Sequence, residues 1–130
     1  RSRGLGDVYQ RQEYEEALED LARVAVAREL LLRWVRERGD RLSRSALARA
    51  ARELDALELA TLFLKRRVLE LAREAGDPHI YRVLDELGLG TDPPPPVRVR
   101  GRTLSFALRV ARRVLGDADP LRVLYRLRAG

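Results

Sequence analysis

The chain has 130 residues and a formal net charge of +6, and this length allows one domain with a buried core. It has no cysteine and one histidine, which excludes disulfides, thiolate metal sites and multi-histidine metal sites. Hydrophobic residues make up 45% of the chain, but no apolar run approaches the roughly 18 residues that a membrane span needs, so we expect no membrane partner.

The first predicted helix begins at the capping residue Asp7 and ends at Arg38, before Gly39. Residues 1–6 precede it as a tail without the apolar core of a signal peptide, so we expect a soluble protein, cytoplasmic if natural. Apolar residues at alternating steps of four and three place one stripe on its inner face. The stripe consists of Tyr14, Leu18, Leu21, Ala25, Leu32 and Val35, interrupted by Arg28.

Residues 42–75 predict a second long helix, because they contain no glycine or proline and are rich in strong helix formers. Asp40 or Ser43 is the expected cap. Steps of three and four again define one stripe. Its members are Leu47, Ala50, Leu54, Leu57, Thr61, Leu64, Val68, Leu71 and Ala75. Since only a short break separates the two helices, we expect a long antiparallel hairpin over residues 7–75.

Three shorter helices are predicted to follow. Asp77-Pro78 opens a helix over residues 77–88, and residues 89–102 form a proline-rich, extended crossover. Thr103 is the expected cap of the first of two helices over residues 103–128. The predicted fold is therefore all-α: a single helical domain over residues 1–130, built on the hairpin with three shorter helices packed against it.

The residue usage is unusual. The chain contains no Met, Cys or Asn, and Lys65 is its only lysine against 25 arginines. With its strong caps and near-continuous heptad-like stripes, the whole chain resembles computationally designed, de novo helical bundle proteins. The resemblance is compositional and rests on no motif. The arginine excess and the proline crossover depart from the Lys/Glu surfaces of such designs, and a very GC-rich natural gene is the alternative origin.

Arg28 stands in the middle of the first apolar stripe, where a guanidinium is costly unless it is paired. It could meet the anionic group of a ligand, it could form a buried pair with a carboxylate such as Glu53, or its stem could lie along the apolar surface with its charged end in water. On an antiparallel hairpin, Arg28 is expected near Ala51. By the same register, Tyr14 is expected near Lys65.

A ligand pocket is predicted where the cover of the hairpin is incomplete. Residues 30–35 and 56–64 are apolar nearly all round their helices and must be covered on every side. A gap in that cover would form a small-molecule site, and plain core is the alternative. The expected lining is Trp34, Thr61, Phe63 and Phe106.

Two single residues are candidates for catalysis. Lys65 in an apolar setting could be a Schiff-base nucleophile, or its stem could lie on the surface with its amine in water or paired with Glu58 or Glu70. His79 could be a haem ligand, which would be its only metal role, or a general base oriented by Asp77. A histidine in the first turn of a helix can equally be a plain surface residue.

The positive charge concentrates in residues 94–130, which hold nine arginines against two aspartates. Six of these arginines follow one another on the crossover and the helix after it, and they could bind the phosphates of a nucleic acid or an acidic partner. They are Arg98, Arg100, Arg102, Arg109, Arg112 and Arg113. No aromatic residues alternate with them to stack bases, and a solvated face is the alternative.

No enzyme signature is present: no glycine-rich phosphate loop, no serine nucleophile motif and no metal-ligand spacing. We therefore expect a non-catalytic helical scaffold that holds a small molecule or cofactor between its helices, and the sequence requires no particular cofactor. One alternative is a natural basic module that binds nucleic acid or an acidic partner. A second is a designed enzyme that uses Lys65 or His79.

Overall fold

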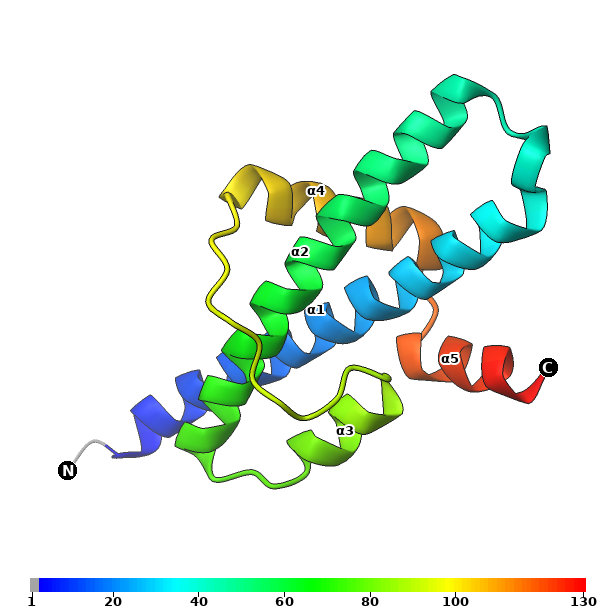
Figure 1. Cartoon of the computed structure of the whole chain (residues 1–130). Coiled ribbons are helices and arrows are strands. Elements are labelled where there is room, and N and C mark those ends of the chain that lie inside the picture. Colours follow the sequence, from blue (N-terminus) through cyan, green and yellow to red (C-terminus); the bar gives the residue numbers. More distant parts are fainter. Residues whose placement is uncertain (1–2) are drawn as a thin grey trace.

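The computed structural model describes residues 3–130, with side chains from Val8 onward, and this part of the chain is helical without any strand. The predicted all-α hairpin with three shorter helices is confirmed (Figure 1). The long helices are joined by the short 3₁₀ turn Gly39–Arg41. The helices are α1 Arg3–Arg38, α2 Arg44–Ala75, α3 Ile80–Glu86, α4 Gly101–Leu115 and α5 Pro120–Ala129.

A side-chain hydrogen bond stabilises each end of the hairpin. At its tip, Ser43 caps α2, because its Oγ accepts a hydrogen bond from the backbone N–H of Ala46 at 3.1 Å. At its base, the hydroxyl of Tyr14 donates to Asp77 Oδ2 at 2.8 Å. The two arms pack closely near the base and diverge toward the tip (Figure 1).

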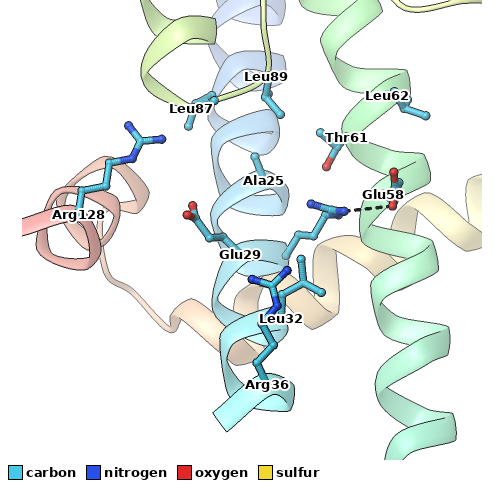
Figure 2. Close-up of a pocket in the computed structure, with 12 residues that line it drawn as sticks. Ala25, Glu29, Leu32, Arg36, Glu58, Thr61, Leu62, Leu87, Leu89 and Arg128 are labelled. Carbon is cyan, nitrogen blue, oxygen red and sulfur yellow. Dashed lines mark hydrogen bonds and ion pairs between the residues drawn. The ribbon is translucent and has the colours of Figure 1, made fainter. Parts of the chain in front are cut away.

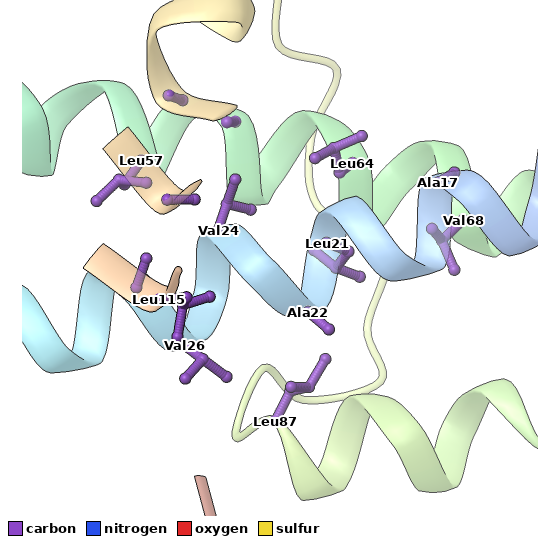
Figure 3. Packing of buried hydrophobic residues seen from close by; sticks show 14 of the residues in the cluster. Ala17, Leu21, Ala22, Val24, Val26, Leu57, Leu64, Val68, Leu87 and Leu115 are labelled. Atoms are coloured by element: carbon purple, nitrogen blue, oxygen red, sulfur yellow. The ribbon is translucent and has the colours of Figure 1, made fainter. Parts of the chain in front are cut away.

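The apolar stripe of α2 is buried only in its central part. Leu57 and Val68 are fully buried, and Leu64 is buried beside them (Figure 3). Leu47, near the tip, leaves 41% of its surface exposed because the arms have separated there. The stripe therefore predicts the core correctly in the middle of the helix and fails where the partner arm diverges.

Helix α4 crosses one face of the hairpin and packs against both arms (Figure 1). Its buried face is made of Ala107, Val110, Ala111 and Leu115, and the two alanines are fully buried. Small side chains allow a close approach of helix to helix. A bidentate ion pair fixes α4 to α2: the two Nη atoms of Arg113 lie 2.6 and 2.8 Å from the carboxylate oxygens of Glu53.

The other short segments cover the remaining sides. Helix α3 packs on α2 with Leu84 fully buried, and α5 packs on α1 with Leu124 fully buried. The crossover between α3 and α4 is extended, as its prolines predict. Arg66 holds it to α2 by donating to the carbonyl of Pro94 at 3.0 Å.

The predicted starts of α1 and α4 were wrong. Helix α1 begins at Arg3, so Asp7 lies inside the helix and is not its cap. Helix α4 begins at Gly101, with Arg100 at the N-cap position and no side-chain capping bond, so Thr103 is not the cap. The exposed first turn of α4 leaves its free N–H groups accessible to water, and a side-chain cap is then dispensable.

The Glu53–Arg113 pair predicts how stability depends on pH. Hydrogen bonds from Arg113 lower the pKa of Glu53 below its ordinary value of 4.5. A carboxyl group whose pKa is lowered by folding stabilises the fold above its unfolded pKa, and this stabilisation disappears as the pH falls through the folded pKa. Arg113→Gln should lower the free energy of unfolding by about 2 kcal/mol at pH 7 and by much less at pH 3, as measured by urea denaturation.

The matched control is Arg109→Gln, which removes an exposed arginine from the same helix without breaking an ion pair among residues 8–130. Equal losses of stability in the two variants at pH 7 would show that the Glu53–Arg113 pair does not hold α4 in place.

Candidate functional site

A cleft of about 390 Å³ opens between α1, α2, the end of α3 and α5 (Figure 2). We call it the interhelical cleft. Its apolar lining is aliphatic: Ala25, Leu32, Leu62, Leu87 and Leu89. Its charged lining residues are Arg28, Glu29, Arg36, Glu58 and Arg128, and Thr61 and Gly88 complete the wall. An apolar body with a few polar groups is the usual construction of a small-molecule site.

Helical periodicity explains what α1 contributes. Arg28, Leu32 and Arg36 lie at successive steps of four, so their side chains share one face and point to the same space. Ala25, one turn earlier, leaves room at the inner end of the cleft because its side chain is a single methyl group. The facing wall comes from Glu58, Thr61 and Leu62 of α2.

The end of α3 is shaped by a Schellman motif. The N–H of Leu89 donates to the carbonyl of Leu84, and the N–H of Gly88 donates to the carbonyl of Asp85, both at 3.0 Å. Gly88 takes φ +73°, a left-handed conformation that favours glycine. This turn presents Leu87 and Leu89 to the cleft.

Lys65 of α2 fixes the position of this turn by a hydrogen bond. Its Nζ donates to the carbonyl of Leu89 at 2.8 Å, and only 8% of the residue surface is exposed. The expected surface position, with the amine in water or paired with Glu58 or Glu70, was therefore wrong. Arg28 and Arg66 take those two carboxylates, and the chain after α3 covers the lysine. Lys65 does not line the interhelical cleft.

Arg28 is in the cleft, but not with its expected partner. Its Nη2 lies 3.3 Å from Glu58 Oε2, and its side chain is 38% exposed. The predicted pairing with Glu53 was wrong because Arg113 binds Glu53. Glu58 lies about two turns beyond Ala51, the position that simple antiparallel counting placed opposite Arg28. Near the base the counting holds, because Arg67 binds Glu13, next to Tyr14, within one residue of the counted position. It fails for Arg28, nearer the tip.

The four residues of the predicted pocket are not gathered in one place. Thr61 is buried, lines the cleft beside Arg28 and donates its hydroxyl to the carbonyl of Leu57 at 2.7 Å. Trp34 lines a separate cavity near the tip of the hairpin. Phe63 and Phe106 are half-buried against the core. The sequence predicted the presence of interhelical space but not which residues share it.

The charges of the cleft are unequally paired. Arg28 and Glu58 form an ion pair, while Arg36, Arg128 and Glu29 take part in none among residues 8–130. The lining therefore carries one more positive than negative charge, and two guanidinium groups keep their donors free. Such groups bind carboxylates and phosphates through paired N–H donors.

Several cleft residues were missed by the sequence analysis. Arg36 could have been found, because it continues the face of Arg28 and Leu32 by one more turn. Arg128, Leu87 and Leu89 could not, since their position depends on how α3 and α5 pack against the hairpin. No local pattern encodes that packing.

His79 is exposed and lies outside the cleft. Helix α3 begins at Ile80, so the predicted start at Pro78 was two residues early. Asp77 accepts from the backbone N–H of His79 at 3.0 Å and from the hydroxyl of Tyr14. These bonds lower the pKa of Asp77, and burial together with the Asp77 bond raises the pKa of Tyr14. Asp77 thus orients the backbone of His79. No group of three metal-binding side chains occurs in the described part of the chain.

The predicted anion-binding arginines have two different environments. Arg98, Arg100, Arg102, Arg109 and Arg112 are exposed, and none forms an ion pair within residues 8–130. Arg113, in contrast, is committed to Glu53. Five of the six are therefore available to a partner.

Comparison with known proteins gives no relative from which a site could be transferred. No protein-family model, curated protein or solved structure matches the chain. Among the helices that the structure describes, none is long and apolar enough to cross a membrane.

Replacing Lys65 tests how the cleft wall is held. Lys65→Met keeps the length of the side chain but leaves the carbonyl of Leu89 without its donor, so the free energy of unfolding should fall by about 1 kcal/mol. The amide of Leu89 should also exchange with solvent faster, as measured by hydrogen exchange. Arg73→Met, at an exposed position of α2, is the control and should change neither quantity. A Lys65→Met protein as stable as the unmodified chain would contradict this role.

Proposed function

We propose that the chain is a non-catalytic helical-bundle scaffold, of computational design, that holds a small organic acid with an aliphatic body in the interhelical cleft. The observation that carries the proposal is the combination of an aliphatic lining with free guanidinium groups in one cleft between helices. A natural helical module with the same cleft would bind the same class of ligand, so the ligand proposal does not depend on the origin.

The size and lining of the cleft favour a short aliphatic chain. Its volume of about 390 Å³ falls within the range of small-molecule sites. Leu32, Leu62, Leu87 and Leu89 surround it, and its lining contains no aromatic residue. Each methylene group of a ligand transferred from water to such a lining contributes about 0.8 kcal/mol.

The charged end of the ligand would meet Arg36 and Arg128. Neither guanidinium has a carboxylate partner among residues 8–130, so binding does not require breaking an existing ion pair. Arg28 uses one Nη2 contact for Glu58, which leaves its other N–H donors free but offsets its positive charge. Glu29 opposes a second negative charge in the cleft, which favours a monocarboxylate over a dianion.

The non-catalytic part of the proposal is supported by what the cleft offers. Its polar groups are three arginines, two glutamates and Thr61, whose hydroxyl already donates to the carbonyl of Leu57. The sole lysine faces a backbone carbonyl and the sole histidine is exposed outside the cleft. Neither of the two catalytic candidates is directed at the cleft.

The designed origin is supported by local features as well as by composition. Three helix ends use strong sequence signals: Ser43 caps α2, Gly76 ends it with φ +65°, and Asp119-Pro120 opens α5. Such agreement between cap residues and helix ends is a regular feature of designed bundles.

Titration with octanoate tests the proposal. We expect saturable binding with a dissociation constant on the order of 1 mM or tighter, measured by isothermal titration calorimetry, and weaker binding of the uncharged octanol. Arg128→Gln should weaken octanoate binding about threefold to fivefold, because it removes one partly exposed charge partner. Octanol binding should not change.

Arg122→Gln is the matched control, because it removes another exposed arginine of α5 that does not line the cleft. Its octanoate affinity should equal that of the unmodified chain. Absence of saturable octanoate binding, or equal effects of the two substitutions, would refute the proposed function.

A second function is favoured by the five exposed, unpaired arginines of the crossover and α4. If each contacts a phosphate of a DNA duplex, the logarithm of the binding constant should fall with the logarithm of salt concentration with a slope of about −4 to −5. Replacing Arg98, Arg100 and Arg102 with glutamine should reduce that slope by about 3 units, as measured by fluorescence anisotropy. A binding constant that does not respond to salt would eliminate nucleic acid as the partner.

A further inference from the structure

A second cavity lies between the diverging ends of α1 and α2 and the C-terminal part of α4. It encloses about 650 Å³, and we call it the tip groove. Its apolar lining consists of Leu30, Leu31, Trp34, Ala46, Ala50 and Val114. This volume also falls within the range of small-molecule sites. The groove exists because the arms have separated here while α4 closes only one side.

The tip groove is distinct from the interhelical cleft. An α-helix turns by about 100° per residue, so Leu30 and Trp34 point nearly opposite to Arg28 and Leu32. The two cavities share no lining residue. The groove is bordered by α4, whereas the cleft is bordered by α3 and α5. A ligand in one cavity does not reach the other.

Trp34 gives the groove a property that the cleft lacks. The residue is 37% exposed, and the Cζ atom of Arg38 lies 4.6 Å from its ring centroid. A guanidinium at this distance forms a cation–π contact and covers one face of the ring. An aromatic ligand can stack on the rest of the indole, an arrangement that adds to the energy of simple apolar burial.

The polar groups of the groove leave one charge uncompensated. Arg113 and Glu53 satisfy each other through two hydrogen bonds. Ser43 Oγ caps α2 and lies 3.2 Å from Ser45 Oγ. Arg49 is exposed on the lining and forms no ion pair among residues 8–130. The groove therefore favours a ligand with a negative charge.

The surroundings add to this preference. Residues 33–52, which include the tip of the hairpin, contain seven arginines against only Glu37 and Asp40. A concentration of one sign of charge raises the local concentration of counter-charged ligands and their association rate. The groove thus combines an aromatic wall, a free guanidinium and a positive surrounding field.

The geometry points to the tip groove as a binding site for a planar aromatic carboxylic acid. The ring lies against Trp34 and the aliphatic walls, and the carboxylate binds Arg49. This site is separate from the interhelical cleft in place and in ligand class, and it does not rest on the proposed function.

The probe is 2-naphthoate, with uncharged 2-naphthamide for comparison. Trp34 is the only tryptophan, so its emission, excited selectively over that of the four tyrosines, reports on this groove. We expect 2-naphthoate to quench Trp34 emission saturably and 2-naphthamide to bind about fivefold more weakly, because it lacks the charge that Arg49 binds. Non-saturable quenching, or equal affinity of the two compounds, would overturn the proposal.

Two variants locate the site. Arg49→Gln should weaken 2-naphthoate binding about fivefold, whereas Arg52→Gln, an exposed arginine on the same helix outside the groove, should not. Ala46→Leu should abolish binding by filling the groove, with circular dichroism showing that the helices are retained. Equal effects of Arg49→Gln and Arg52→Gln would exclude the groove as the site.

Two further measurements distinguish ligand binding in the tip groove from binding in the interhelical cleft and from dimer formation. Arg128→Gln, which alters the interhelical cleft, should leave 2-naphthoate binding unchanged, so failure of one site does not imply failure of the other. Sedimentation of the chain alone should show a monomer whose Trp34 emission is independent of protein concentration. A dimer that changes Trp34 emission would identify a second copy of the chain as the occupant and overturn the proposal.

Discussion

The packing of α4 across both arms of the hairpin is the contact on which the rest of the structure depends. At the base, α1 and α2 pack directly and are joined by the Tyr14–Asp77 bond. Further toward the tip, α4 inserts its buried face against both arms, and the Glu53–Arg113 pair fixes it to α2. The arms diverge toward the tip in the part of the hairpin where α4 packs against both of them (Figure 1).

Both candidate binding sites follow from this divergence. On the face covered by α4 the open end of the hairpin becomes the tip groove, and on the other side α3 and α5 leave the interhelical cleft. Arginines border both cavities because arginine is almost the only cation in the chain. The walls differ, since the cleft is aliphatic and the groove contains Trp34. Because both cavities offer arginines but have different walls, we expect the interhelical cleft to bind aliphatic acids and the tip groove to bind aromatic acids.

The sequence predicts local structure well and relative placement poorly. The periodic stripes and the cap at Ser43 predicted the helices, the hairpin and the central core, because each depends on neighbouring residues. The partner of Arg28 depends on how the arms diverge toward the tip, and the burial of Lys65 depends on the chain after α3. The ligand pocket stays a prediction: of its expected residues, Arg28 and Thr61 line the interhelical cleft, and that lining also includes Arg128 of α5. Tertiary packing decides these features, and no stripe or cap encodes it.

Nuclear Overhauser contacts between methyl groups of the intact chain test the role of α4 most directly. If α4 keeps the arms apart, the methyl groups of Ala107, Ala111 and Leu115 will show contacts to residues of both α1 and α2. Leu47, near the tip of α2, will show none to α1. Contacts from Leu47 to α1, together with α4 methyl groups that contact a single arm, would mean that the hairpin closes along its whole length and would contradict the account.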